Sequence, residues 1–384
     1  MAAAGAAAAE SPDVFPVMGW DWAPNDPAVL SEMRACGLTV AGFVSPETLD
    51  ACHAAGLKAI VHDPRCAGYD WTKVDPVVAR QQLTELIGEV RDHPAVFGYY
   101  LRDEPSSAFF PGLAAVSAVV KELHPGAWPY VNLFPNYADV GQLGAPNYDA
   151  YLENFIATCE PPILSYDHYA LLEGGGLRDG YFANLESMRN AALKHKLPFW
   201  NIVLATAHFN YREVTAHDLG FQVYTTLAYG ARGIAYFKYF TPAHGNFRSG
   251  PIDQFGNKTP LWEAMRFVNL QIEQLAPTLL QLTSDQVYHF GDVPQGCAGP
   301  DEESLIAALD GPMLVGDFTH ADGSRHVLVV NRDVTSSRPC APQFRTPPAK
   351  VERIQPYNGQ LTPFDGENIW LGPGSGALLK LSPY

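Results

Sequence analysis

The densest group of residues that could do chemistry is the segment Tyr-Leu-Arg-Asp-Glu-Pro at positions 100–105. Two neighbouring carboxylates, Asp103 and Glu104, follow an apolar run and precede a proline, which cannot donate to a strand ladder. The pair therefore marks the end of a buried strand, where side-chain alternation predicts Glu104 and Arg102 on one face and Asp103 on the other. Carboxyl groups in this place can act as general acids and bases. An ion pair between Glu104 and Arg102 is the structural alternative.

Polar and aromatic residues also follow most of the other short apolar runs. The runs cover residues 15–20, 39–44, 57–61, 96–101, 130–134, 163–166, 199–204 and 233–240. The candidate ligand-binding residues at or just after their carboxyl ends are Trp20, Asp21, Trp22, His62, Arg102, Asp103, Asn132, His168, Tyr169, His208, Lys238 and Tyr239. Rings stack on the C–H faces of sugars, and Asn, His and Arg hydrogen-bond sugar hydroxyls. The mixture predicts a carbohydrate substrate.

The motifs of several other reaction classes are missing from the sequence. There is no phosphate loop ending in Gly-Lys-Ser/Thr and no Gly-x-Ser-x-Gly nucleophile elbow. The six cysteines form no Cys-x-x-Cys pair, and His62, Asp63 and His168 lack the short spacing of a metal site. We therefore expect no metal and no cofactor. Cys297 and Cys340 could pair if the protein is exported.

These residues need a scaffold that brings the ends of eight strands together. Helical stretches lie between the runs, at residues 74–90, 112–123, 148–159, 181–195, 214–229 and 260–282. Alternating strands and helices predict parallel pairing through right-handed crossovers, and eight such units fit a (β/α)8 TIM barrel. A doubly wound sheet is the alternative, but its glycine-rich first turn is absent.

The predicted organisation has three parts. Residues 1–12 are expected to be a disordered tail, residues 13–283 the catalytic barrel, and residues 284–384 an accessory β-sandwich domain. The last part is assigned from short apolar runs that alternate with Gly, Pro, Asp and Asn turns without a helical period. Residues 241–257 are expected to form a lid over the barrel because this long loop contains two flexible glycines.

Charge and composition limit the partners of the chain. With 41 acidic and 25 basic residues among 384, the net charge is −16, and no block of Lys and Arg occurs. This argues against nucleic acid and anionic membranes as partners and favours a neutral or weakly charged ligand. No apolar stretch reaches the length of a membrane span. A secreted or periplasmic location is expected, a cytoplasmic one is left open, and the oligomeric state is not predicted.

The segment at positions 100–105 resembles the Asn-Glu-Pro signature of clan A glycoside hydrolases. Further segments are similar to family-42 β-galactosidases: Gly-Ala-Arg-Gly-Ile at 230–234, Asp-Gln-Phe-Gly at 253–256 before Thr-Pro at 259–260, and Leu-Gly-Pro-Gly at 371–374. The resemblance implies a barrel glycosidase with Glu104 as general acid/base. It also implies an Asn where Asp103 stands, and a Glu nucleophile after the seventh strand.

The seventh strand is instead followed by Ala-Thr-Ala-His at 205–208. Glu213 is the nearest carboxylate and is expected in the first turn of the next helix, where the dipole favours it. Asp167 is therefore the first candidate for nucleophile or base, followed by Asp21 and Asp103. A carboxyl separation of about 5–5.5 Å predicts retention and about 6.5–9.5 Å predicts inversion; a substrate-assisted route is also open.

The expected function is thus glycoside hydrolysis in a poly- or oligosaccharide. One alternative is a non-catalytic carbohydrate-binding barrel, because the seventh-strand acid is missing. Another is a polysaccharide lyase acting on a uronic-acid glycan, in which Arg102 or Lys238 neutralises the uronate.

Overall fold

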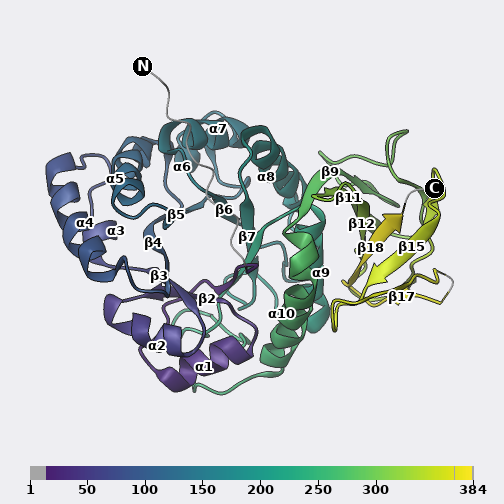
Figure 1. The fold of residues 1–384 in the computed structure, drawn as a ribbon, viewed down its shortest axis with the longest axis horizontal. Coiled ribbons are helices and arrows are strands. Elements are labelled where there is room, and N and C mark those ends of the chain that lie inside the picture. The colour runs from purple at the N-terminus through teal and green to yellow at the C-terminus, as the bar shows by residue number, and fades with distance from the viewer. Residues whose placement is uncertain (1–13, 367, 383–384) are drawn as a thin grey trace.

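The computed structural model describes residues 14–366 and 368–382, so the expected tail at 1–12 lies outside the described residues. Eight parallel strands close in sequence order, with the first strand paired to the eighth (Figure 1). They are β1 (Val17–Gly19), β2 (Val40–Val44), β3 (Lys58–Val61), β4 (Val96–Asp103), β5 (Trp128–Leu133), β6 (Leu164–Asp167), β7 (Phe199–Leu204) and β8 (Gly233–Phe237). The predicted (β/α)8 barrel is confirmed. The carboxyl ends of these strands and the loops after them form the barrel mouth.

Helices surround the strands (Figure 1). They are α1 (Pro27–Ala35), α2 (Leu49–Ala54), α3 (Pro64–Ala67), α4 (Pro76–Val90), α5 (Phe110–Leu123), α6 (Val140–Leu143), α7 (Tyr148–Cys159), α8 (Tyr181–His195), α9 (Ala216–Ala228) and α10 (Pro260–Leu279), with short 3-10 turns η1 (Pro46–Thr48) and η2 (Ser107–Phe109). Local sequence determines where several of these helices begin. Asp26 and Asp75 accept hydrogen bonds from the first free N–H groups of α1 and α4, each followed by a proline.

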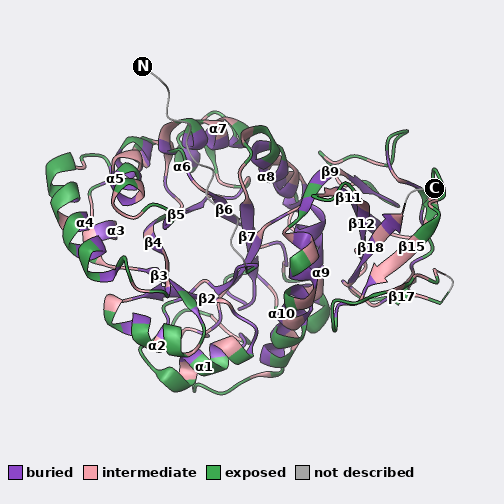
Figure 2. Ribbon diagram, viewed as in Figure 1, coloured by how far each residue is buried: buried purple, intermediate pink, exposed green. Residues whose placement is uncertain are grey.

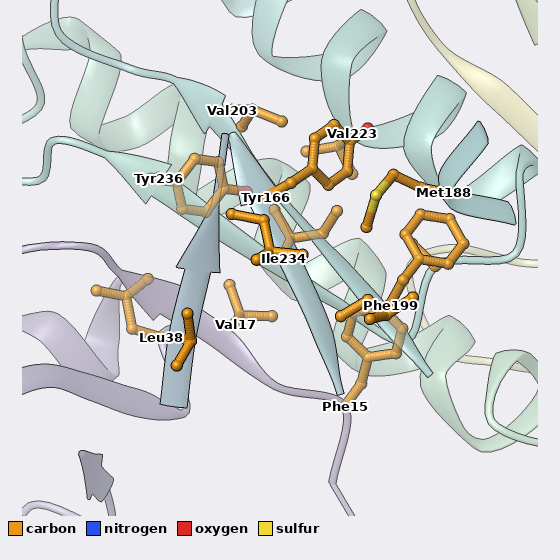
Figure 3. Close-up of a cluster of buried hydrophobic side chains, with 14 of the residues drawn as sticks. Phe15, Val17, Leu38, Tyr166, Met188, Phe199, Val203, Val223, Ile234 and Tyr236 are labelled. Atoms are coloured by element: carbon orange, nitrogen blue, oxygen red, sulfur yellow. The ribbon is translucent and has the colours of Figure 1, made fainter. Parts of the chain in front are cut away.

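Two apolar layers hold the barrel. The outer layer lies between strands and helices, whose outer faces are exposed (Figure 2). Figure 3 shows part of this layer, including Phe15, Val17, Leu38, Tyr166, Phe199, Ile234 and Tyr236. The inner layer fills the barrel with large rings, among them Phe43, Trp128, Tyr130 and Trp200.

Two of the large rings inside the barrel, Trp200 and Trp128, fit because glycines face them. Gly233 pairs with Trp200 across β7 and β8, and a Cβ atom on this glycine would lie 2.3 Å from the indole nitrogen. Gly98 pairs with Trp128, and a Cβ atom there would lie 2.4 Å from the carbonyl oxygen of Trp128. Because each tryptophan lies opposite a glycine, the interior reaches the close packing of a protein core.

The C-terminal part is all-β, which confirms the predicted β-sandwich region. Its main sheet has the order β16 (Leu361–Pro363), β15 (Lys350–Ile354), β18 (Gly376–Ser382), β12 (Arg325–Asn331), β11 (Met313–His320) and β9 (Leu282–His289). Two short pairs complete it: β10 (Ile306–Ala308) with β14 (Gln343–Phe344), and β13 (Arg338–Pro339) with β17 (Trp370–Leu371). The sheet packs on α9 through β11 and β12, beside the barrel (Figure 1).

The proposed Cys297–Cys340 disulfide is not formed. Cys297 Sγ lies 3.7 Å from the Tyr229 hydroxyl, whereas Cys340 is buried in the core of the β domain. Both thiols are free. The two cysteines fall in the same stretch of sequence, but the fold directs one to the barrel and the other into the β core.

Replacing Gly233 tests the packing of the barrel interior. We expect Gly233→Ala to lower the free energy of unfolding by about 1–3 kcal/mol, because the added methyl group overlaps the Trp200 ring. Urea denaturation followed by circular dichroism measures the change. Gly88→Ala on α4 is the control: a Cβ atom there meets nothing within 4 Å, and helix propensity predicts a gain of about 0.5–1 kcal/mol. An unaltered stability of Gly233→Ala would contradict this account.

Candidate active site

Three carboxyl groups and one amide meet where β4, β5 and β6 end. Strand register places Asp103 beside Asn132, and Asn132 beside Ser165. The Asn132 amide nitrogen donates to Asp103 Oδ1 at 3.0 Å and to Asp167 Oδ1 at 2.8 Å. Glu104 lies close enough to Asp167 for a side-chain hydrogen bond. The structure therefore brings Glu104 together with Asp167, the partner expected from the sequence.

Asn132 acts as a bridge in this carboxyl cluster. Its carbonyl oxygen accepts a hydrogen bond from Ser165 Oγ at 3.2 Å, and the Tyr130 hydroxyl bonds to Ser165 at 2.8 Å. With both amide hydrogens directed at Asp103 and Asp167, the buried Asn132 has no N–H left for a sugar. It positions the carboxyl groups from within the barrel.

The backbone of Glu104 breaks the alternation expected along β4. Glu104 has φ of 41°, and its N–H donates to the Asn132 carbonyl at 2.8 Å. The register also shifts between Tyr100 and Arg102. The prediction that Glu104 and Arg102 share a face is therefore wrong. Arg102 is exposed, with its guanidinium 5.4 Å from the Phe109 ring centroid, and among the described residues it forms no ion pair with Glu104.

Burial and mutual repulsion keep a proton in this cluster. Burial, and then the charge of Asp103, raise the pKa of Glu104 to about 7, against the opposing hydrogen bond from Asp167. Burial, followed by the charges of Glu104 and Asp103, raises the pKa of Asp167 well above its ordinary value. Asp103 also has a raised pKa because of burial, which Asn132 partly offsets. Burial and like charge thus favour the protonated forms of Glu104 and Asp167, and Glu104 titrates near neutral pH.

A second polar contact joins the first and last strands at the mouth. Lys238 Nζ lies 2.7 Å from Asp21 Oδ1, and the backbone N–H groups of Trp22 and Phe240 donate to the same carboxylate at 3.1 and 3.0 Å. Burial raises the pKa of Asp21 although Lys238 lowers it. Both carboxylate oxygens of Asp21 are therefore occupied, and so is the ammonium group of Lys238. The predicted pair of site residues links the end of β1 to the end of β8.

One aromatic wall stands on the β1 to β4 side of the mouth. Trp22 is 54% exposed, and its ring centroid lies 4.3 Å from that of His62. Tyr100 packs on the other side of His62 at 5.4 Å. Burial lowers the pKa of His62, which keeps the ring neutral at neutral pH. Neutral imidazole beside an open indole suits contact with a sugar ring.

A second aromatic wall stands on the β6 to β8 side. Tyr169 packs on His208 and Phe237 at 5.5 and 5.1 Å. His208 stacks on Phe247 at 5.0 Å, donates from Nδ1 to the Thr206 carbonyl at 2.9 Å, and has a pKa lowered by burial. Phe209 is 72% exposed at the top of this wall. His208 is buried by these rings and shapes the wall.

The structure places three predicted site residues away from the mouth surface. The hydroxyl of Tyr239, 1% exposed, accepts a hydrogen bond from Trp262 Nε1 at 2.8 Å under α10. His168 is buried and bonds through Nδ1 to Asn184 at 3.0 Å. Trp20 packs inside the barrel against Phe43 and Phe237. Side chains near a strand end point alternately inward and outward, so proximity in sequence does not bring them together.

The end of β7 carries no acid. Ala205 and Thr206 are buried there, and Thr206 Oγ1 donates to the Lys238 carbonyl at 2.8 Å. The expectation that Glu213 lies in the first turn of the next helix is wrong. A capping box between Thr215 and Asp218 starts α9 at Ala216, which leaves Glu213 exposed in the preceding loop.

The loop at 241–257 is anchored to its surroundings. Asn246 accepts from the Phe209 N–H at 2.7 Å and donates to the Phe209 carbonyl at 2.8 Å. Arg248 pairs through a β-bridge with Ala207 and forms an ion pair with Glu173 at 2.7 Å. These contacts attach the loop to the second aromatic wall, and its role as a lid stays a prediction.

Within residues 14–366 and 368–382, no group of three or more His, Cys, Asp and Glu residues is arranged to hold a metal ion. In the same ranges, no helix has the length and apolar character needed to cross a membrane. The secreted or periplasmic location stays a prediction.

No protein-family model matches the sequence, and no curated protein is detectably similar to it. Several solved structures share its fold. A glycoside hydrolase matches with a TM-score of 0.60 and 12% identity, over 97% of this chain and 93% of that chain. A family-5 glycoside hydrolase from Bacteroides vulgatus matches with 0.58 and 12%, over 97% and 89%.

A β-galactosidase from the psychrophilic Marinomonas ef1 matches with a TM-score of 0.51 and 12% identity, over 68% of this chain. The match spans 60% of the β-galactosidase chain. The chain shares the barrel fold of these glycoside hydrolases. Identities this low show the fold alone.

Two residues at the mouth, Arg178 and Tyr211, were not predicted from the sequence. Arg178 lies in the glycine-rich stretch between β6 and α8, and its guanidinium is 4.2 Å from the Tyr137 ring centroid. Its side chain also reaches the Tyr211 hydroxyl at 3.1 Å. Neither Arg178 nor Tyr211 belongs to a motif or directly follows a strand, so no local pattern marked them.

The Asp103 charge is expected to set the acidity of Glu104. We expect the isosteric Asp103→Asn to lower the pKa of Glu104 below its value of about 7, because a negative neighbour is removed. Carboxyl carbon NMR titration measures the shift. Glu213→Gln, which removes an exposed carboxylate, is the control and leaves the pKa unchanged. An equal or higher pKa in Asp103→Asn would contradict this assignment.

The raised pKa of Glu104 also predicts how stability varies with pH. The pKa is about 7 in the folded protein against an ordinary value of 4.5. The folded state therefore binds more protons than the unfolded state, and this group makes stability fall as pH rises through that window. We expect Glu104→Gln to raise the free energy of unfolding by about 1–2 kcal/mol at pH 8 and by almost nothing at pH 4.

Urea denaturation at the two pH values measures this difference. Glu213→Gln serves as the control and changes stability by less than about 0.5 kcal/mol at either pH, since its carboxylate is exposed. A gain of equal size at pH 4 and pH 8 would show that charge burial at Glu104 is not the cause.

Proposed function

We propose that the protein is a glycoside hydrolase that cleaves a glycosidic bond in a poly- or oligosaccharide. The observation that carries the proposal is the carboxyl cluster at the mouth, in which Glu104 has a pKa of about 7. General acid/base catalysis works best with a pKa near the working pH. The shared barrel fold of solved glycoside hydrolases supports the same function.

Glu104 is the general acid/base in this proposal. Its protonated form donates to the glycosidic oxygen as the bond to the anomeric carbon breaks, and its carboxylate then takes a proton from the attacking water. Glu104 is half-buried at the end of β4, whereas Asp167 is 3% exposed. Glu104 is therefore the carboxyl of this pair that a substrate at the mouth can reach.

Asp167 is the second carboxyl of the pair, and its burial and hydrogen bonds determine its chemical role. It is buried, accepts from Asn132, and has a pKa raised by burial and by the charges of Glu104 and Asp103. Because its protonated form is favoured, less carboxylate is present to act as nucleophile or base. We therefore assign Asp167 the role of sharing its proton with Glu104, which holds the two groups together in the free protein.

Asp103 is the remaining candidate for the charged partner. Asp21 is engaged by Lys238, and burial disfavours the charged form of Asp167. Asp103 is half-buried next to Glu104 and is oriented by Asn132. Its charge would stabilise the positive charge that develops at the anomeric carbon. The exposed rings of Trp22 and Phe209 would hold sugar units on either side.

A non-catalytic carbohydrate-binding barrel is the second candidate function. It is favoured by one observation, that Ala205 and Thr206 occupy the end of β7. The lyase alternative is less well supported, because Lys238 is paired with Asp21 and Arg102 stacks over Phe109. Lys238 is then not free to neutralise a uronate beside Glu104, and Arg102 is exposed over Phe109.

Glu104→Gln tests the proposed hydrolase. We expect kcat to fall by about 10²–10⁴-fold with KM changed little, because the proton donor is lost while the binding residues stay. Reducing-end release from a panel of aryl glycosides and polysaccharides measures turnover, with absorbance of unsaturated uronates followed in parallel. Glu213→Gln is the matched control and should retain wild-type rates.

The possible outcomes separate the candidate functions. Wild-type turnover by Glu104→Gln would overturn the assignment of Glu104. Glycan binding without turnover by the wild-type protein on the whole panel would favour the non-catalytic barrel. An unsaturated product would identify a lyase.

Asp167→Asn is expected to shift the pH optimum while retaining turnover, because a buried amide still reaches Glu104.

A further inference from the structure

Arg178 is held in the second aromatic wall by contacts with three tyrosines. Its guanidinium lies 4.2 Å from the ring centroid of Tyr137 and 5.4 Å from that of Tyr211. It donates to the Tyr211 hydroxyl at 3.1 Å and to the Tyr169 carbonyl at 3.3 Å. Stacking and hydrogen bonds thus fix this half-buried cation before any ligand binds.

The charge of Arg178 has no acidic partner within residues 14–366 and 368–382. Two neighbouring cations each have one: Lys238 pairs with Asp21 at 2.7 Å, and Arg248 pairs with Glu173 at 2.7 Å. Asp179, next to Arg178, is exposed and forms no ion pair with it among these residues. A half-buried guanidinium left unpaired in a chain of net charge −16 is unexpected.

Arg178 lies close to the carboxyl cluster. Tyr169, whose carbonyl it contacts, is two residues after Asp167 at the end of β6. Tyr137 connects the two groups as well: burial and the charge of Asp167 raise the pKa of its hydroxyl, while Arg178 lowers it. Tyr137 thus contacts Arg178 and also senses the charge of Asp167.

We propose that Arg178 is a specificity-determining residue that binds an anionic substituent of the substrate sugar. A uronate carboxylate or a sulfate presents two oxygens, which a guanidinium binds with two parallel N–H groups. The proposal rests on the proposed function of the same site. It revises the expectation of a neutral ligand: net charge repels anions overall, so an anionic sugar needs a local, fixed cation to be selected.

A binding experiment tests this without requiring turnover. The Glu104→Gln protein is applied to an array of paired oligosaccharides, in which each neutral member has a uronate and a sulfated counterpart. We expect an anionic member to bind at least about tenfold more tightly than its neutral counterpart, with a preference that weakens as salt rises. Preference for the uronate or for the sulfate identifies the substituent.

Variants of Arg178 connect this preference to the residue. In the Glu104→Gln parent, a second substitution Arg178→Gln should abolish the preference for anionic members. Arg178→Lys should retain part of it, because lysine keeps the charge but lacks the planar guanidinium. Arg80→Gln makes the same change in net charge at an exposed arginine that contacts Glu122 at 3.0 Å on the outside of the barrel. This control should bind as the parent does. Unchanged thermal unfolding confirms that each variant is folded.

Each other outcome overturns the inference. Tighter binding of neutral members, an anionic preference that survives Arg178→Gln, or binding to no glycan would each do so. Failure of the inference and failure of the proposed function are distinguishable. Glu104-dependent hydrolysis of neutral glycans would overturn the role of Arg178 alone, whereas Arg178-dependent binding of anionic glycans without hydrolysis by the wild-type protein would overturn the hydrolase alone.

Discussion

The hydrogen bonds from Asn132 to Asp103 and Asp167 are the constraint on which the site depends. Several carboxyl groups this close together repel one another when charged, and their burial adds a desolvation cost. The amide bridge and a retained proton are what allow them to stay together. The same arrangement gives Glu104 a pKa near neutral, so the property that costs stability is the one that suits acid/base chemistry.

This bridge is anchored in the barrel interior. Ser165 and Tyr130 fix the amide from below, and Tyr130 belongs to the inner cluster of rings that includes Trp128 and Trp200. Trp128 and Trp200 fit because Gly98 and Gly233 lie opposite them. The packing of the interior therefore sets the position of Asn132, and through it the carboxyl cluster. Elsewhere around the barrel mouth, the Asp21–Lys238 ion pair links the end of β1 to the end of β8.

The mouth above the cluster combines an open aromatic surface with an uneven distribution of charge. Trp22 and Phe209 are the most exposed rings of the two walls. Lys238 and Arg248 are neutralised by carboxylates, while Arg178 is held by tyrosines alone. In the proposed function, the acidic centre and the half-buried Arg178 at its edge would orient a sugar by charge as well as by stacking.

The sequence by itself determined the eight strands, the caps that start several helices and the place of Glu104 at the end of the fourth strand. These features are local: apolar period, capping residues and proline act within a few positions. Tertiary structure alone decided which side chains meet. Asp21 and Lys238 are 217 residues apart, Tyr239 turns into the core, and a left-handed backbone at Glu104 breaks the alternation. Register shifts between neighbouring strands and the directions of loops set such contacts, and no local pattern encodes them.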